Sequence, residues 1–301
     1  MSKRLPDLVK SAFQKAKSTN DLTYYPTQVV DISVSSLPFQ LRFSPSLASK
    51  PKGPPKSATT KPFDPFAYSP LPKLFIADLS PTHYLVLNKF AITEEHFILA
   101  TKEFKPQTHV LERADLEGAL ECVKAFKDDG GLFVFFNGGE HSGASQPHRH
   151  LQLLPVQRMK DGLREDSPWE VLTSKLDEAP FQTFAEKISL KVSGEELYAA
   201  YLRLHHKACE AAGVQGDVAA GGEAKISYNL AMTEDVLVVC PRVAEGGVIA
   251  DSNGQEVGKL SLNGTMLAGT ALVKSEAEWD ALNQNPQTVT NILKGVGLPK
   301  L

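Results

Sequence analysis

Apolar runs of strand length recur along the chain. Three of them, at residues 73–79, 83–90 and 96–101, follow one another at short spacing and predict three successive antiparallel strands. The run LFVFF at 132–136 is apolar throughout, which is typical of a strand buried on both faces at the centre of a sheet. Further strands are expected within 29–43, 148–156 and 260–274, and residues 226–240 are expected to form a hairpin.

Several candidate capping residues are followed by apolar residues at helical spacing, which predicts helices. Asp115 precedes an apolar stripe that ends near residue 126, so we expect it to cap a helix. Ser193 and Glu196 have the spacing of a capping box for a helix that runs to about residue 212. Ser275 and Glu278 have the same spacing and predict the first of two closing helices.

The N-terminal segment 3–17 is amphipathic and basic. Its apolar stripe consists of Leu5, Leu8, Val9, Ala12, Phe13 and Ala16. A mitochondrial presequence shares this character but is rich in Arg and poor in acidic residues, whereas this segment has one Arg and contains Asp7. We therefore favour a helix docked on the core, with a presequence as the alternative.

These elements predict an α+β protein with a mostly antiparallel sheet and flanking helices. Residues 44–66, dense in Pro, Ser, Thr and Lys, are expected to form a long loop, and residues 157–185 to be irregular. We divide the chain into an N-terminal part, 1–190, and a C-terminal part, 191–301. The strand, turn, strand rhythm of 83–99 recurs in 227–239, as it would in two related halves.

Composition narrows the class of protein. With 301 residues, 42% hydrophobic and 22% charged, the chain can bury a substantial core. A net charge of −3 argues against a nucleic-acid binder. We see neither an apolar run near the roughly 20 residues of a membrane helix nor a secretory signal, so we expect no membrane association. Three distant cysteines fit a reducing compartment, hence a cytoplasmic location, which leaves the nucleus open as well.

The most informative segment is NGGEHSGASQPHRHLQ, residues 137–152. Alternate side chains of a strand share a face at steps of ~6.6 Å, so His148, His150 and Gln152 are predicted to project together. Arg149 is then predicted to face the other way. The preceding glycines and small residues carry little side-chain bulk, so backbone N–H groups and the Ser145 hydroxyl can approach an anion closely. The pattern predicts a phosphate cradle that leads into a reactive histidine.

Three simpler interpretations compete with this one. Asn-Gly pairs are common in plain hairpins, so the NGG triplet by itself is compatible with a turn. A His-x-His pair can chelate a transition metal, and His141 offers a third ligand, although metal sites normally use three or four ligands with supporting contacts. Two core histidines bonded to backbone carbonyls are the third alternative, which does not explain the glutamine on the same face. We predict no metal at this motif.

His150 is the predicted nucleophile. An imidazole with a pKa of ~6.5 is mostly neutral at pH 7, so it can attack phosphorus without a partner base. It needs orientation, which a backbone carbonyl accepting from Nδ1–H would supply by leaving Nε2 as the attacking atom. His83 and His96 lie in neighbouring predicted strands, and we interpret both as satisfied structural histidines.

HRHLQ resembles the motif of the transferase branch of the histidine triad superfamily, in which the middle histidine forms a covalent nucleotidyl intermediate. The chain also resembles the fungal-type diadenosine tetraphosphate phosphorylases, or ATP adenylyltransferases, in segments that span nearly its whole length in order: SLASKP, HYLVLNKF, FNGGEHSGASQPHRHLQ, SYNLAMT with VVCPR, and LNGTMLAGTALVK. The family implies a histidine-triad-like nucleotidyltransferase fold of two related halves. It also implies the reversible conversion of diadenosine tetraphosphate and phosphate to ATP and ADP.

The resemblance further implies the site residues. The chemistry falls to His148, His150 and Gln152. The residues implied at the substrate are Lys50, Asn88, Lys89, Asn137, Gly143, Ala144, Ser145, Gln146, Asn263, Gly264, Thr265, Thr270 and Lys274. The lysines would act as point charges around a polyphosphate. The implied ligands are a dinucleoside polyphosphate, ATP, ADP and phosphate, with no tightly bound cofactor. Whether Mg²⁺ accompanies the nucleotide, and whether the protein is a monomer or a homodimer, stays open.

Gln152 stands where histidine triad hydrolases carry a third histidine. An amide cannot deliver a proton to a leaving group, but ATP departs as a stable polyphosphate anion. Donors that organise the phosphoryl oxygens therefore matter more than general acid catalysis. We expect Gln152 to hold the phosphoryl group and to favour phosphorolysis over hydrolysis.

Two other functions stay open. A uridylyltransferase acting on hexose 1-phosphate shares the His-x-His-x-Gln arrangement, but those enzymes often add a zinc site, and this chain lacks the Cys pairs for one. A non-catalytic dinucleotide-binding sensor on the same scaffold would not need His150 and Gln152 to be intact.

Overall fold

One antiparallel sheet runs through the centre of the protein. The computed structural model describes residues 4–46, 64–67, 73–215 and 221–300. The strands of this large sheet follow in the order β10 (Phe184–Lys187), β12 (Val236–Arg242), β11 (Ser227–Met232), β8 (Leu132–Gly138), β9 (His150–Pro155), β7 (Phe97–Thr101), β5 (His83–Leu87) and β4 (Phe75–Asp78). All neighbouring pairs are antiparallel. The predicted α+β class is confirmed, and LFVFF lies on β8 near the middle of the sheet.

Smaller sheets accompany the large one. β15 (Thr270–Val273) pairs in parallel with β3 (Leu37–Phe43), which pairs antiparallel with β2 (Gln28–Val34). β13 (Gly246–Ala250) and β14 (Glu256–Ser261) form an antiparallel hairpin, and β1 (Thr23–Tyr24) pairs in parallel with β6 (Phe90–Ala91). The strands expected within 29–43 and 260–274 therefore meet, because β3 and β15 are neighbours.

The helices lie around these sheets. They are α1 (Leu5–Ser18), α2 (Arg113–Ala125), α3 (Val156–Met159), α4 (Gly194–Ala211), α5 (Glu276–Gln284) and α6 (Gln287–Val296). The capping boxes predicted for α4 and α5 are both present: Ser193 accepts from the backbone of Glu196, and Ser275 from that of Glu278. Both helices therefore begin where their sequence signals place them.

Two details of the predicted elements are corrected. Glu112, not Asp115, is the N-cap of α2; Asp115 is the third helical residue, and its Oδ2 accepts from the Glu112 N–H at 2.7 Å. Glu112 and Asp115 form a capping box, and because both are acidic, the sequence alone does not show which of them is the N-cap. The segment 157–185, expected to be irregular, contains the end of α3 and the start of β10, an edge strand of only four residues.

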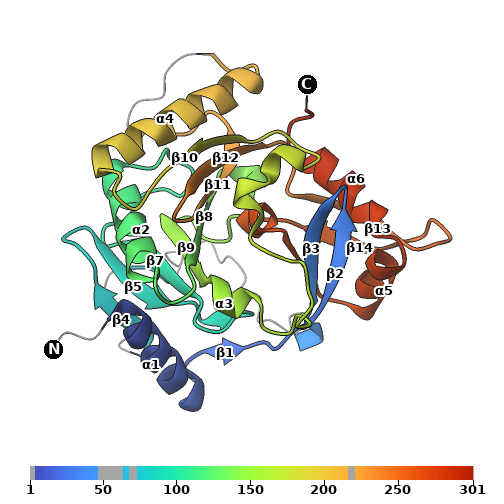
Figure 1. Ribbon diagram of the computed structural model, residues 1–301, viewed down its shortest axis with the longest axis horizontal. Coiled ribbons are helices and arrows are strands. Elements are labelled where there is room, and N and C mark those ends of the chain that lie inside the picture. The colour runs from blue at the N-terminus through green and yellow to red at the C-terminus, as the bar shows by residue number, and fades with distance from the viewer. Residues whose placement is uncertain (1–3, 47–63, 68–72, 216–220, 301) are drawn as a thin grey trace, which may run out of the picture.

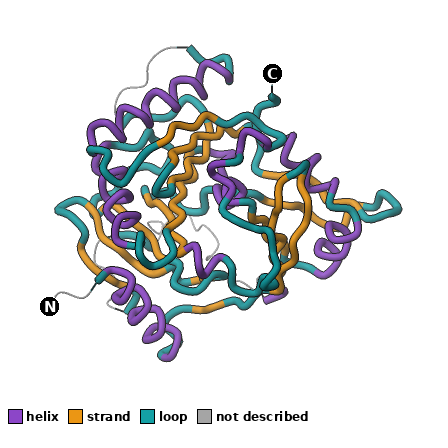
Figure 2. Tube along the Cα trace, in the orientation of Figure 1, coloured by secondary structure: helices purple, strands orange, loops and turns teal. Residues whose placement is uncertain are grey.

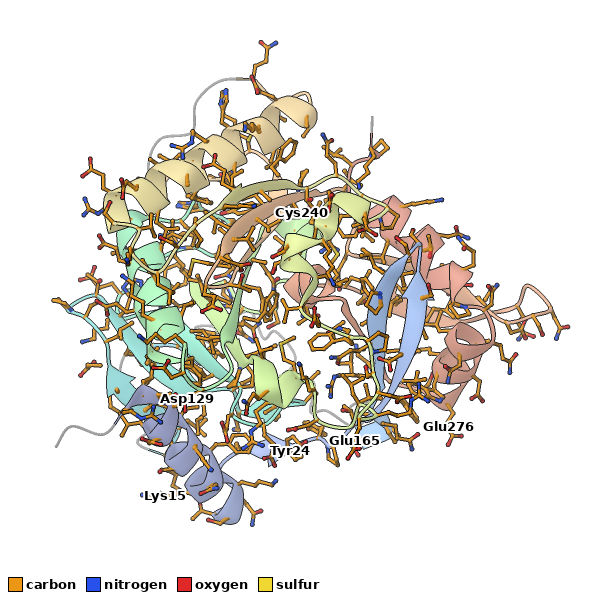
Figure 3. The ribbon with its side chains drawn as sticks, viewed as in Figure 1. Lys15, Tyr24, Asp129, Glu165, Cys240 and Glu276 are labelled. Carbon is orange, nitrogen blue, oxygen red and sulfur yellow. The ribbon has the colours of Figure 1, made fainter. Side chains whose placement is uncertain are left out.

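The large sheet separates two hydrophobic cores. On β8, Val134 and Phe136 belong to the first core with α1, α2 and α4, whereas Phe133 and Phe135 belong to the second core with β2, β3 and the C-terminal helices. Figure 1 shows α2 and α4 on one side of the sheet and the red C-terminal elements on the other. Side chains fill the space between the strands of Figure 2, as Figure 3 shows. On β8 each core therefore buries one set of alternating residues, whereas successive residues of β5 and β7 all belong to the first core.

The predicted N-terminal helix docks on the first core. Val9, Phe13 and Ala16 are buried, and α1 contacts β4, β5 and α2. The two segments with a shared rhythm also fall in matching places, because the β5–β7 hairpin flanks β9 and the β11–β12 hairpin flanks β8. Within the described ranges, no helix is long and apolar enough to span a membrane.

Candidate active site

His150 opens β9 on the face of the sheet that carries the second core. Its Nδ1 lies 2.8 Å from the carbonyl oxygen of His148, so Nδ1–H donates there, as predicted, and Nε2 is left with the lone pair. None of the described residues hydrogen-bonds Nε2. Burial lowers the pKa of His150 to about 4, only partly opposed by the bond to His148. The ring is therefore neutral at pH 7, as a nucleophile requires.

His148 is held at both ring nitrogens. Nδ1 lies 2.7 Å from Asp64 Oδ2, and Nε2 lies 2.9 Å from the carbonyl oxygen of Thr101. The phenyl ring of Phe66 contacts both histidines, with its centroid 4.7 Å from that of His150 and 6.1 Å from that of His148. His148 and His150 therefore face the same side, and the ring of His148 has no nitrogen to spare for attack.

Gln107 is a site residue that no sequence pattern singles out. Its Oε1 accepts from the backbone N–H of His150 at 2.8 Å, and its Nε2 donates to the carbonyl oxygens of Asn137 and His150 at 2.9 and 3.1 Å. This buried amide joins the start of β9 to the end of β8. Its partners lie 30 and 43 residues away along the chain, so no local pattern could have revealed it.

Gln152 lies two residues after His150 on β9, so both side chains are on the same face of the sheet. It pairs with Phe135 of β8 and Ile98 of β7. Its side-chain amide lies close to His96. Burial lowers the pKa of His96 to about 4, and the nearby Gln152 amide opposes this fall only in part. The amide of Asn88 lies 3.2 Å from Nδ1 of His96.

His96 therefore lies close to two candidate site residues, Asn88 and Gln152, and its interpretation as a structural histidine stays a prediction. His83 is a satisfied structural histidine, as predicted: Nε2 bonds Asp115 at 2.8 Å and Nδ1 bonds Thr82 at 2.9 Å. The sequence does not distinguish the two, because each lies in a predicted strand.

The glycine-rich loop has the open backbone that the sequence predicts. Gly143 has φ +80°, and a Cβ there would lie 2.8 Å from the carbonyl oxygen of Leu262, so the loop packs tightly on the C-terminal part. Ser142 is fully buried and donates from Oγ to the carbonyl of Gly139 at 2.7 Å. Ala144 and Ser145 are exposed, so the loop surface is open to a ligand.

The C-terminal turn of the predicted site meets this loop through Asn137. Asn137 Oδ1 accepts from the Gly264 N–H at 2.8 Å and from Asn229 Nδ2 at 2.9 Å. Asn263 caps the following 3-10 helix, since its Oδ1 accepts from both the N–H and the hydroxyl of Thr265, at 2.9 and 2.8 Å. Residues 137 and 263–265 are thus brought together although they lie more than a hundred positions apart.

The remaining predicted residues are placed less tightly. Thr270 is buried, accepts at its carbonyl from the Thr265 hydroxyl at 3.2 Å, and has an Oγ1 with no partner in the described part of the chain. Gln146 is half-buried, Lys89 and Lys274 are exposed, and Lys50 lies outside the described residues. Across the described ranges there is no group of three or more His, Cys, Asp or Glu side chains that could hold a metal ion.

Comparisons with known proteins agree with this geometry. The family model of the Ap4A phosphorylase N-terminal domain matches residues 1–174, and that of the ATP adenylyltransferase C-terminal domain matches residues 177–299. Diadenosine 5',5'''-P1,P4-tetraphosphate phosphorylase 2 of Saccharomyces cerevisiae is 29% identical over 322 residues, covering 99% of this chain and 96% of the relative.

Solved structures of the yeast Ap4A phosphorylase Apa2 are similar over the whole chain. One superposes with a TM-score of 0.78 at 25% identity and covers 100% of this chain and 99% of that chain. The structure of the same protein in complex with Ap4A gives a TM-score of 0.76 at 25% identity, with 100% of both chains covered.

Proposed function

The chain belongs to the Ap4A phosphorylase family, and on that premise we propose that it catalyses the reversible phosphorolysis of diadenosine tetraphosphate. Inorganic phosphate is the second substrate, and ATP and ADP are the products. The observation that carries the proposal is the neutral ring of His150, fixed through Nδ1 and without a partner at Nε2 among the described residues, beside an amide on the same face. This arrangement suits covalent nucleotidyl transfer by an imidazole.

The first step forms an adenylyl-histidine. Nε2 of His150 attacks the phosphorus next to one adenosine, the bond between that phosphorus and the bridging oxygen breaks, and ATP leaves with the bonding electrons. The imidazole becomes cationic as its second nitrogen is substituted. The Nδ1–H bond to the His148 carbonyl strengthens as this charge develops, which is transition-state stabilisation of the kind that accelerates the step.

The second step regenerates the enzyme. A phosphate oxygen attacks the same phosphorus, the bond to Nε2 breaks, and ADP leaves. We assign Gln152 the task of holding the phosphoryl oxygens during both steps. Its place on β9, between Ile98 of β7 and Phe135 of β8, puts the amide on the same face as His150 before the substrate arrives. No proton needs to reach a leaving group in either step.

The remaining residues bind substrate in this proposal. Asn137 and the run Gly143, Ala144, Ser145 and Gln146 hold the AMP moiety, and Asn263, Gly264, Thr265 and Thr270 close the site from the C-terminal part. Lys50, Lys89 and Lys274 neutralise the polyphosphate, with Asn88 beside them. The enzyme carries no tightly bound cofactor, and any Mg²⁺ that the reaction uses arrives with the polyphosphate.

A labelling experiment tests this function. The protein is incubated with diadenosine tetraphosphate and isotopically labelled phosphate, and the products are resolved. Equal amounts of ATP and ADP, with all label in the ADP, support the proposal. Label in ATP, or AMP as the main product, contradicts it. Tight binding without turnover indicates the sensor instead, and turnover only of a sugar nucleotide with a hexose 1-phosphate indicates the uridylyltransferase.

A further inference from the structure

The guanidinium of Arg242 is buried directly behind the substrate loops, and no carboxylate of the described residues hydrogen-bonds it. Arg242 ends β12 and is 3% exposed. Its neighbour two residues earlier, Cys240, lies inside the molecule in Figure 3. Every bond that the described residues accept from this guanidinium ends on a neutral oxygen: the Asn229 side chain and the carbonyls of Ala244, Glu245, Leu262 and Val296.

These bonds connect the C-terminal part of the chain to the glycine-rich loop. Nη1 donates to Asn229 Oδ1, and Asn229 Nδ2 in turn donates to Asn137 Oδ1 and to the Ser142 carbonyl, both at 2.9 Å. Asn137 Oδ1 also accepts from Gly264 N–H at 2.8 Å. Asn137 and Ser142 are therefore held by one guanidinium through the Asn229 amide, and Gly264 is held through Asn229 and Asn137 in series.

A second branch reaches the same turn from the other direction. Nη2 of Arg242 donates to the carbonyl of Leu262 at 3.1 Å, immediately before Asn263. Leu262 is also the residue against which Gly143 packs. Both walls of the predicted nucleotide site, the loop after β8 and the turn at 263–265, thus depend on Arg242.

The positive charge itself calls for an explanation. Burying a cation without an anion is strongly unfavourable, and burial lowers the pKa of Arg242 to about 10. A neutral side chain could fill the same space at lower cost. Glu245 lies close enough to oppose the effect of burial on the pKa of Arg242 only in part. The proposed ligand is a polyanion, so the positive charge behind its cradle is compensated further when the ligand binds. The charge also polarises the amide of Asn229, which strengthens the hydrogen bonds that this amide donates.

We propose that Arg242 is a positioning residue for the substrate: through Asn229 it fixes the two anion-binding walls and supplies positive potential to them without touching the ligand. This inference rests on the proposed function of the site. It assigns a role to a residue in the VVCPR segment, where the sequence pattern alone indicates only a buried strand end.

Arg42 on β3 provides a matched control. It is 2% exposed, burial lowers its pKa to about 10, and its guanidinium also bonds only neutral oxygens among the described residues. Those oxygens belong to Gln40, Thr27, Met159 and Asp161, none of which is a candidate site residue. Replacing either arginine removes a comparable buried cation, but only Arg242 bonds the glycine-rich loop through Asn229 and the carbonyl of Leu262 before the turn at 263–265.

The test compares Arg242→Met, Arg242→Lys and Arg42→Met by steady-state kinetics, calorimetric binding of AMP, and thermal unfolding. We expect Arg242→Met to raise KM and the Kd for AMP by at least about tenfold, as the loss of charged hydrogen bonds implies. Arg42→Met should leave both within about twofold at a similar loss of Tm. Arg242→Lys should recover part of the affinity, because the charge is retained while the planar fork is lost.

An equal kinetic effect of Arg242→Met and Arg42→Met would assign Arg242 to stability alone and overturn the inference. If Arg242→Met does not fold, Arg242→Lys and Asn229→Ala carry the test, and unchanged KM and Kd in both contradict it. The Arg242→Lys, Asn229→Ala double variant should lose less than the sum of the single losses. Failure of the proposed function is separate: wild-type protein would then give no ATP and ADP, while AMP binding would still test Arg242.

Discussion

The two faces of the segment 148–150 carry buried polar groups that differ in how many hydrogen-bond partners they have. On one face, Arg149 bonds Asp115 Oδ2 at 3.1 Å and Glu112 at 3.0 Å, and His83 bonds Asp115 Oδ1 at 2.8 Å. On the other face, His150 has one nitrogen bonded and the other unpartnered among the described residues. Adjacent residues of one short segment thus build a closed ion cluster on one side of the sheet and an open, reactive ring on the other.

The electrostatics of the two faces differ in the same way. Burial acts to raise the pKa of Asp115, but the hydrogen bond from His83 and the charge of Arg149 outweigh it and hold the carboxylate ionised. For His150, burial has no nearby anion strong enough to oppose it and the ring stays neutral. Although Arg149 Nε has no partner among the described residues, the opposite charges of Arg149, Asp115 and Glu112 hold one another, and such a cluster stabilises the fold. A buried imidazole that keeps a free lone pair is available for chemistry.

The largest expected effect separates the two buried histidines. His150→Ala should lower kcat by at least about 10⁴-fold, as removal of a covalent nucleophile does, with little loss of Tm. His83→Ala should lower Tm and leave kcat of the remaining folded protein close to wild type. A reversed pattern in steady-state kinetics and thermal scans would show that the faces have been assigned the wrong roles.

The second largest expected effect concerns the ion cluster of Arg149, Asp115, Glu112 and His83. Arg149→Met leaves Asp115 buried without its cation and should lower the free energy of unfolding by about 3–5 kcal/mol in denaturant titrations. The control is Arg113→Met, which breaks an exposed pair with Glu117 and should have no measurable effect. Equal stability of the two variants would contradict a closed cluster behind β9.

A smaller effect concerns Gln152. Gln152→His supplies a group that can transfer protons, so hydrolysis of the adenylyl-histidine should compete better with phosphorolysis. We expect the ratio of AMP to ADP to rise by about tenfold or more, within the roughly 10²–10⁴-fold that general acid–base catalysis contributes. Gln152→Asn, which keeps an amide, is the control. An unchanged product ratio in Gln152→His would remove the reason given for the glutamine.

The mildest test varies pH. Because the pKa of His150 is about 4, adenylylation in a single turnover should keep its rate as pH falls from 7 to 5 and decline only towards pH 4. The pKa values of His96 and His205 are likewise about 4. Between pH 6.5 and 4 the unfolded chain binds more protons than the folded one, so stability falls with pH by about 1.4 kcal/mol per unit for each such histidine. A rate that halves near pH 6.5 would indicate an ordinary, solvated imidazole.

Local patterns predicted much of the fold and the reacting face. The alternation of apolar residues placed the strands, and the spacing of Ser193 and Glu196 placed the start of α4, because these signals depend only on neighbours in sequence. The same alternation put His150 and Gln152 on one face and Arg149 on the other. β10 was missed because four residues at a sheet edge carry almost no periodic signal.

The residues that hold the site residues in place could not be predicted from such local patterns. Gln107, Asn229 and Arg242 act through hydrogen bonds to segments that are distant in sequence. The residues next to each of them in the sequence form no motif that indicates a functional role. Asp64, which bonds His148 across 84 positions, lies in a stretch whose composition indicates only a loop. Tertiary pairing, which sequence spacing does not encode, decides their roles.

The most direct test of the central claim is the intact mass of the protein after exposure to diadenosine tetraphosphate without phosphate. We predict a gain of one adenylyl group, located on residue 150 by peptide mapping, absent from His150→Ala, and released as ADP when phosphate is added. An adduct that persists in His150→Ala, or wild-type turnover with no adduct at any time, would contradict the account.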